Sequence, residues 1–239
     1  MNVCQALCRP PKAAYKRNGV LPMSKVDIAV VDYGMGNLRS VSKAVLHVAN
    51  GKSVVVTSDA TVIQAAERVI FPGQGAMPDC MRELDARHLR EAIVDAAKNK
   101  PFLGICIGMQ LLFDHSEEGD TAGLGLIKGT VVRFAEKLTD DAGDKLKVPH
   151  MGWNQVFQSY NHGRKHALWA DIADETRFYH VHSYYAAPLD SAVTVGETEY
   201  PKRFTSAVAR DNIFATQFHV EKSANAGLQL LANFVNWKP

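Results

Sequence analysis

Three residues in this chain have types and positions that suit nucleophilic catalysis: Cys106, His219 and Glu221. Cys106 follows an apolar stretch and lies between Gly104 and Gly108, with one residue separating it from each glycine. A nucleophile placed between a strand and a helix needs a sharp turn, and flanking glycines relieve the crowding there. The sulfur would then lie at a helix N-terminus, which favours the reactive thiolate. The alternative is a structural cysteine buried in the core, a common role of this residue type.

A thiolate nucleophile needs a base, and the base needs a group that orients it. Residues 215–223 read ATQFHVEKS and offer both. If 214–220 is a strand, His219 and Glu221 point to the same face, so the carboxylate can hold the second ring nitrogen of the imidazole. Val220 would then point into the core. The alternative is a surface histidine beside a solvated Glu-Lys pair.

The elements expected to position these residues alternate between strand and helix over the first half of the chain. Glycine-bearing turns follow three of the strands, and ligands bind beyond the carboxyl ends of strands in open α/β sheets. The alternation indicates βαβ units, so we predict an α/β domain with a mixed, mostly parallel central sheet flanked by helices. The expected strands of the first half are 26–32, 53–57, 68–71 and 102–105. The expected helices are 38–50, one capped by Ser58 or Asp59, 88–100, one that starts at 109–113, and one from about Ser223. After residue 123 the pattern changes to strands, within 123–134, 147–158, 177–187, 193–200 and 204–220.

Composition places the chain among ordinary globular proteins. It is 46% hydrophobic and 22% charged, and no stretch approaches the 18 apolar residues of a membrane span. Four cysteines without a C-x-x-C pair argue against a disulfide framework or a zinc site, and they fit a reducing, cytoplasmic location. We expect no metal, because His162 and His166 lie in a polar loop without partners at ligand spacing. We expect no nucleotide cofactor either, because GMGNLR at 34–39 lacks the third glycine of a dinucleotide fingerprint.

The first 22 residues differ from the rest in charge. They hold four basic residues and no acid, and they lack the apolar region of a secretory signal. We expect 1–22 to be a disordered extension, with a single domain over 23–239. Without those four residues, 23 basic side chains stand against 25 acidic ones. This balance does not suggest a nucleic-acid partner.

Longer segments carry a resemblance to a known family. GICIGMQ at 104–110, followed far downstream by FHVE at 218–221, resembles the class I, triad-type, glutamine amidotransferases. Within that class, PHMGWN at 149–154 and VHSY at 181–184 resemble the glutaminase subunits of imidazole glycerol phosphate synthase. The resemblance covers residues 25–237. It implies a flavodoxin-like fold and the hydrolysis of L-glutamine to glutamate and ammonia.

The resemblance also implies a role for each matched residue. Cys106 would attack the side-chain amide carbon of glutamine, His219 would transfer the protons, and Glu221 would orient His219. Water would then hydrolyse the resulting thioester. The implied oxyanion-hole residues are Gly73, Gln74, Gly75 and Ile107, and the implied glutamine-binding residues are Gln110, Ser183 and Tyr184.

The implied partner is a cyclase subunit with a (β/α)₈-barrel fold, in a heterodimer that acts in histidine biosynthesis. The cyclase would use the ammonia to convert a phosphoribulosyl-formimino carboxamide nucleotide to imidazole glycerol phosphate and aminoimidazole carboxamide ribotide. Barrels of this kind carry their chemistry at the carboxyl face, so ammonia would enter from the opposite rim. We expect Met151, Trp153 and Tyr179 near that seam, because aromatic anchors dominate interface energetics. The alternative places Trp153 in the core. We expect no membrane or nucleic-acid partner.

Two positions depart from the family pattern. Val220 stands where proline is usual, and its strand preference predicts that the triad geometry is kept. Gln74 stands where an aliphatic residue is frequent, beside a loop whose peptide orientation is associated with activation. Three alternatives remain: a cysteine hydrolase of the α/β-hydrolase type, in which the acid precedes the histidine, a non-catalytic module with a relic triad, and a glutaminase of another synthase, such as the anthranilate or pyridoxal phosphate type.

Overall fold

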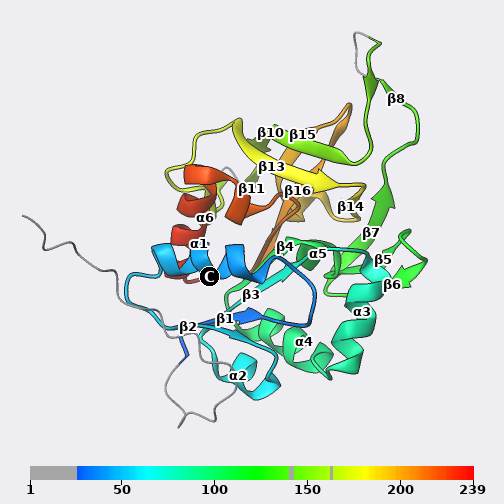
Figure 1. Cartoon of the computed structure of the whole chain (residues 1–239). Coiled ribbons are helices and arrows are strands. Elements are labelled where there is room, and N and C mark those ends of the chain that lie inside the picture. The colour runs from blue at the N-terminus through cyan, green and yellow to red at the C-terminus, as the bar shows by residue number, and fades with distance from the viewer. Residues whose placement is uncertain (1–25, 140–142, 162–163) are drawn as a thin grey trace, which may run out of the picture.

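A computed structural model describes residues 26–139, 143–161 and 164–239. Within these residues, one sheet of 13 strands crosses the molecule, and helices lie on both of its faces (Figure 1). The main path through the sheet is β2-β1-β3-β4-β17-β16-β14-β7-β5-β6, with β10, β13 and β15 joined to it beside β16. The expected extension, 1–22, lies outside the described residues.

The half of the sheet from β2 to β17 is parallel and is made of apolar strands. Its strands are β1 (Ile28–Val31), β2 (Val54–Thr57), β3 (Arg68–Gly73), β4 (Phe102–Cys106) and β17 (Ile213–Thr216). Strands β1, β3, β4 and β17 are buried along their whole length, as expected for parallel strands covered on both faces. β4 lies between β3 and β17, so its carboxyl end is at the centre of the parallel half.

Helices cover both faces of this half. α1 (Leu38–Val48) and α6 (Ala224–Asn236) pack against each other on one face, whereas α2 (Ala60–Ala65) and α4 (Arg90–Asn99) cover the other (Figure 1). Each is amphipathic: α4, for example, buries four apolar residues on its inner side, Ala92, Ile93, Ala96 and Ala97. Asp59 caps α2 by accepting a hydrogen bond from the Thr61 N–H, as its sequence predicts.

The other half of the sheet is mainly antiparallel. Strand β10 pairs with β13 over seven residue pairs, from His150 opposite His182 to Val156 opposite Thr176. The strands are β5 (Phe113–Ser116), β6 (Thr121–Ala122), β7 (Ile127–Arg133), β10 (His150–Gln158), β13 (Thr176–His182), β14 (Tyr184–Pro188), β15 (Thr194–Glu199) and β16 (Arg203–Arg210). Two small hairpins join β8 (Leu138–Thr139) to β9 (Lys145–Leu146) and β11 (Tyr160–Asn161) to β12 (Arg164–Lys165). Short 3₁₀ turns are η1 (Ala167–Trp169), η2 (Ser191–Val193) and η3 (Val220–Lys222).

The sequence-based element predictions fail at three places. Helix α3 (Met77–Ala86), which starts directly after the glycine-rich turn at 73–75, was not predicted. The helix after Cys106, α5 (Ile107–Gln110), has a single turn, and Phe113 already begins β5. Because residues 111–113 are fully buried, their apolar character indicates the core and does not distinguish a helix from a strand.

The third failure concerns the strand before His219. β17 ends at Thr216, not at Val220, and the chain continues into the turn η3. Val220 still points into the core, as predicted, and is almost fully buried.

Among the described residues, no helix is long and apolar enough to cross a membrane.

Helix α6 fixes the turn η3 through one very close approach. A Cβ atom placed on Gly227 would lie 1.9 Å from the Val220 carbonyl oxygen and 2.8 Å from its carbonyl carbon. A glycine inside a helix costs about 1 kcal/mol relative to alanine. At this position the helix therefore gives up intrinsic stability so that η3 can pack against it.

We predict that Gly227→Ala lowers the free energy of unfolding by about 2 kcal/mol, because overpacking outweighs the gain in helix propensity. Urea denaturation measures the change. Asn225→Ala, at an exposed position of the same helix, is the matched control and should stay within about 0.5 kcal/mol of the parent. If Gly227→Ala were more stable than the parent, the close packing of α6 on η3 would be wrong.

Candidate active site

Three neighbouring strands of the parallel half end at the same edge of the sheet. Gly73 at the end of β3 pairs directly with Cys106 at the end of β4, and Thr216 of β17 pairs with Ile105 on the other side. Parallel strands deliver their carboxyl ends to one edge, where α/β proteins bind ligands. Segments that are far apart in the sequence therefore meet around Cys106.

Cys106 occupies a strained turn between β4 and α5. Its φ is +56° and its ψ is −112°, a conformation that costs a residue with a side chain of the order of 1–3 kcal/mol. Added Cβ atoms would lie 1.9 Å from the Phe71 carbonyl oxygen at Gly108 and 2.8 Å from the Gly108 carbonyl oxygen at Gly104. The two glycines therefore allow α5 to lie directly against β3 and β4, and this contact holds the thiol at the strand end.

His219 lies between Cys106 and Glu221. Its Nδ1 is 2.9 Å from the Glu221 Oε1, and the Cys106 sulfur lies near enough to act on the charge of its ring. The side chains of His219 and Glu221 are 4% and 1% exposed. In a site this deeply buried, charges interact more strongly than in water. The structure thus brings together all three residues that the sequence pattern singled out.

The charge state of His219 follows from this arrangement. Burial opposes the charged form, but the Cys106 sulfur and the Glu221 carboxylate outweigh it and raise the pKa of His219 above its ordinary value. A raised pKa keeps a proton on the imidazole of His219. The charged ring would stabilise negative charge that develops on the neighbouring sulfur, which a cysteine nucleophile requires.

The backbone of His219 is held by Ser223, which sequence reasoning missed, and by Tyr179, which it placed only at the partner interface. Its N–H donates to the Tyr179 carbonyl of β13 at 2.9 Å, and its carbonyl accepts from the Ser223 hydroxyl at 2.6 Å. Ser223 Oγ in turn accepts from the Tyr179 N–H at 3.0 Å. This closed set of three bonds explains why the triad geometry is kept although the strand expected through Val220 has ended. The long-range pairing with β13 leaves no local signal in the sequence.

A second missed residue is Gln217, which links Cys106 to the predicted glutamine-binding residues. Its Nε2 lies 3.9 Å from the Cys106 sulfur, and its Oε1 accepts from Gln110 Nε2 at 3.0 Å. Gln110 Nε2 also donates to the Tyr184 carbonyl at 3.0 Å. Gln110 Oε1 is buried and has no hydrogen-bond partner among the described residues. Ser183, the third predicted glutamine-binding residue, immediately precedes Tyr184 in the chain.

The predicted oxyanion-hole residues lie on either side of Cys106. Gly73 pairs with Cys106, while Gln74 and Gly75 continue into an exposed turn in which Gly75 has a φ of +104°. Ile107 is the first residue of α5, where backbone N–H groups have no intrahelical partner. Both backbone segments thus border Cys106.

A buried pair, Tyr33 and Cys80, is hydrogen-bonded to the turn at 73–75. The Tyr33 hydroxyl donates to the Cys80 sulfur at 3.7 Å, and the Cys80 thiol donates to the Gln74 carbonyl at 3.8 Å. Burial is the main cause that raises the pKa of Cys80 to about 11. Cys80 therefore stays a thiol at neutral pH, whereas Cys106 has the imidazole of His219 nearby.

An exposed apolar face lies beside the triad. Met151 and Trp153 are 63% and 48% exposed, and Trp153 packs edge-to-face on Tyr179 at 6.2 Å between ring centroids. The alternative that placed Trp153 in the core is therefore wrong. Tyr179 connects this face to the site, because its carbonyl accepts a hydrogen bond from the His219 N–H. The Lys222 ammonium also lies 5.8 Å from the centre of the Tyr179 ring.

Comparison with known proteins agrees with this geometry. Residues 29–237 match the family model described as glutamine amidotransferase class-I. Proteins named imidazole glycerol phosphate synthase subunit HisH are similar over nearly their whole length. The one from Aromatoleum aromaticum is 62% identical over 214 residues, 89% of this chain and 99% of that protein. The one from Thiobacillus denitrificans is 64% identical over 215 residues, 90% of this chain and 92% of that protein.

Solved structures show the same fold at low sequence identity. A putative GMP synthase protein from Thermoplasma acidophilum has a TM-score of 0.62 at 16% identity, covering 89% of this chain and 94% of that one. The PurLQS structure from Thermotoga maritima has a TM-score of 0.60 at 19% identity, covering 89% of this chain and 99% of the other. With the family match and the identity to the HisH subunits, the chain belongs to the class-I glutamine amidotransferases and, within them, to the HisH subunits of imidazole glycerol phosphate synthase.

Proposed function

We propose that this chain is the glutaminase subunit of an imidazole glycerol phosphate synthase and that it hydrolyses L-glutamine through a thioester at Cys106. The observation that carries the proposal is the buried contact of Cys106, His219 and Glu221 at the ends of three strands. The alternative of an α/β-hydrolase is disfavoured because the acid follows the histidine by two residues.

The first step is the attack of the Cys106 thiolate on the side-chain amide carbon of glutamine. A carbon–sulfur bond forms, and the amide oxygen takes the negative charge. Backbone N–H groups of the turn at 73–75 and of Ile107 stabilise this oxyanion, an effect worth about 3 kcal/mol for each donor elsewhere. His219 then delivers its proton to the nitrogen, the carbon–nitrogen bond breaks, and ammonia leaves.

The second step is hydrolysis of the thioester. His219, now neutral, takes a proton from water, and the hydroxide attacks the thioester carbon. The carbon–sulfur bond breaks, which releases glutamate and restores the thiolate–imidazolium pair. Glu221 orients the ring through Nδ1, so that Nε2 faces Cys106 throughout.

Gln110, Ser183 and Tyr184 hold the amino-acid end of glutamine in this proposal. Gln110 Nε2 is already engaged by Tyr184 and Gln217, which fixes the orientation of the amide. Its Oε1 remains free to accept from the α-ammonium group of the substrate. A preoriented acceptor binds without the entropy cost of ordering a mobile side chain.

The released ammonia passes to a cyclase partner with a (β/α)₈-barrel fold, which docks on the face of Met151, Trp153 and Tyr179 to form a heterodimer. Exposed aromatic and methionine side chains beside the triad suit such an interface. The cyclase uses the ammonia to make imidazole glycerol phosphate in the cytoplasm, as part of histidine biosynthesis. Tyr179 of this face holds the backbone of His219, so the face lies close to the base of the triad.

We predict that Cys106→Ala lowers glutamine hydrolysis at least about 10⁴-fold, because no other group replaces the nucleophile. The complex with cyclase should still form product from ammonium salt at raised pH, since the acceptor chemistry lies on the partner. Glutamate release and product formation are measured separately. Cys8→Ala, in the segment expected to be an extension, is the matched control and should keep the full activity. Glutamine hydrolysis by Cys106→Ala would contradict the assigned nucleophile.

His219→Asn should cost nearly as much as Cys106→Ala, and Glu221→Gln should cost less, because the orienting carboxylate is usually the least costly member of a triad to lose. Glu221→Gln should also lower the pKa of His219, since it removes one of the groups that raise it. NMR titration of the imidazole measures this shift. An unchanged pKa in Glu221→Gln would place the carboxylate in a purely structural role.

The partner proposal predicts a stepwise rise in activity. Glutamate release should be slow for the chain alone, faster with cyclase, and fastest with cyclase and its nucleotide, which requires coupling between the two sites. Trp153→Ala should weaken assembly at least about tenfold with little loss of thermal stability, as expected for an interface anchor. Leu189→Ala, an exposed apolar residue outside this face, is the control. Equal rates of glutamate release by the chain alone, with cyclase, and with cyclase and nucleotide would indicate an autonomous glutaminase.

A further inference from the structure

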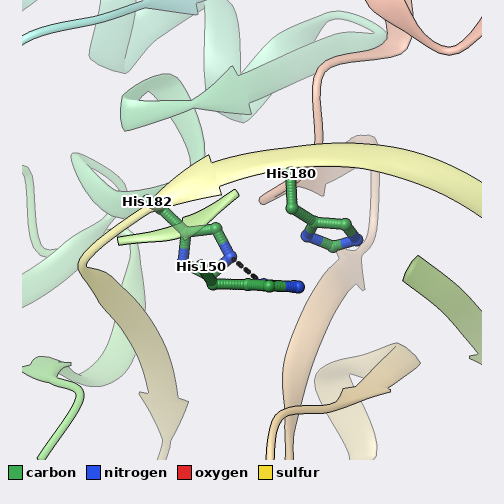
Figure 2. A group of neighbouring side chains, drawn as sticks. All are labelled: His150, His180 and His182. Atoms are coloured by element: carbon green, nitrogen blue, oxygen red, sulfur yellow. Dashed lines mark hydrogen bonds between the residues drawn. The ribbon is translucent and has the colours of Figure 1, made fainter. Parts of the chain in front are cut away.

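Three buried histidines meet between β10 and β13, and no catalytic step described above uses them. His150 comes from β10, and His180 and His182 come from β13 on the same inner face of the pair (Figure 2). One ring nitrogen from each lies within 4.8 Å of the other two. The sequence did not reveal this group, because the register of two antiparallel strands brings it together.

The hydrogen bonds of His150 and His182 fix where their protons are. The Asn154 amide group donates to His150 Nε2 at 3.2 Å, so His150 carries its proton on Nδ1. That proton points at His182 Nε2, 3.2 Å away. His182 carries its own proton on Nδ1, which donates to the Tyr184 carbonyl at 2.8 Å. The lone pair of His182 Nε2 therefore faces the middle of the group.

His180 is different, because neither of its ring nitrogens has a partner among the described residues. Its ring is 0% exposed and stacks on His150 at 4.8 Å between centroids. A buried polar group without a hydrogen bond is destabilising, and such groups in native proteins call for an explanation. A ligand that binds a ring nitrogen of His180 would explain why this ring has no hydrogen-bond partner among the described residues.

We propose that His150, His180 and His182 form a binding site for a late first-row divalent cation, with Zn²⁺ as the ion of choice. Neutral imidazole is a preferred ligand of such ions, and three histidines plus water form a complete tetrahedral set. The site is separate from Cys106 and does not depend on the proposed glutaminase activity.

The distances suit this ion. With Zn–N bonds of about 2.0–2.1 Å, neighbouring ligand nitrogens in a tetrahedron lie about 3.3 Å apart. His150 Nδ1 and His182 Nε2 are already 3.2 Å apart, which matches this spacing. Binding requires His180 to rotate inward and the other two rings to tilt until all three lone pairs point at one ion. The bond from His182 Nδ1 to the Tyr184 carbonyl is the outer contact that orients most metal-binding histidines.

All three imidazoles are neutral at physiological pH. Burial lowers the pKa of His150 to about 4 and, with the neighbouring His150 charge, that of His182 to about 3. Burial likewise lowers the pKa of His180 well below its ordinary value. Protons therefore do not compete with a cation for the ring nitrogens. An ion could enter from the surface hollow lined in part by Asn154 and Tyr200, which both contact His150.

Asn154 provides a sharp test, because one contact must change when the ion binds. Ligation through His150 Nδ1 moves that proton to Nε2, where it would face the N–H donors of Asn154. Asn154→Asp replaces these donors with a carboxylate that can accept the Nε2 proton. Such an outer carboxylate also adds a negative charge beside the cation. We therefore expect Asn154→Asp to bind Zn²⁺ about 10- to 100-fold more tightly.

The experiment uses the full chain with Cys4, Cys8 and Cys106 changed to alanine, so that these thiols do not compete for the metal. After treatment with a chelator, the protein is titrated with Zn²⁺ by calorimetry and with Co²⁺ by visible absorption. We expect one ion per chain, a tetrahedral Co²⁺ spectrum, and a thermal midpoint that rises with Zn²⁺ because the ion binds the folded state.

His180→Phe, which keeps a flat ring in the core, should abolish the saturable Zn²⁺ step and the Co²⁺ spectrum while the fold is retained. His47→Gln, at an exposed position of α1, should leave both unchanged. The proposal falls if no ion binds, if His180→Phe binds as the parent does, or if Asn154→Asp binds more weakly. Should His180→Phe fail to fold, the Asn154→Asp comparison still decides between the two outcomes.

Discussion

The close contact between α5 and β3 is the constraint on which the site depends. The α-carbon of Gly108 lies so near the Phe71 carbonyl that no larger residue fits, and Gly104 leaves room for α5 from the other side. This contact places the first turn of α5 over the strand ends, which forces Cys106 into its positive-φ turn. Because β17 pairs with the other edge of β4, the segment that carries His219 and Glu221 then arrives at the same place.

The sequence was sufficient to predict the parts of this site that have local signals. Two glycines around Cys106 indicated the strained turn, and the apolar runs before it indicated buried parallel strands. The contact between His219 and Glu221 was also predicted, although for an incorrect reason. The expected strand alternation is absent there, and a 3₁₀ turn held by β13 and α6 brings the two side chains together.

Features that depend on register between distant strands could not be predicted. Ser223 and Tyr179 are 44 residues apart, and their bond exists only because β13 lies beside η3. The same applies to the link from Gln217 to Gln110, which are 107 residues apart, and to the three histidines of β10 and β13. Trp153 shows the opposite case. Its residue type fitted both core and surface, and only the strand's orientation decided between them.

Tyr179 has two neighbours of different kinds, and this has a mechanical consequence. Its ring belongs to the exposed face with Trp153, whereas its backbone carbonyl holds the N–H of His219. A force applied to the ring reaches the imidazole through a single peptide group, without a hinge or a lid. The position of β13 therefore sets the alignment of the base with the sulfur, whereas the strained turn at Cys106 is set by its own glycines. The nucleophile and the base are thus held by different elements, and the strand that holds the base also carries part of the exposed face.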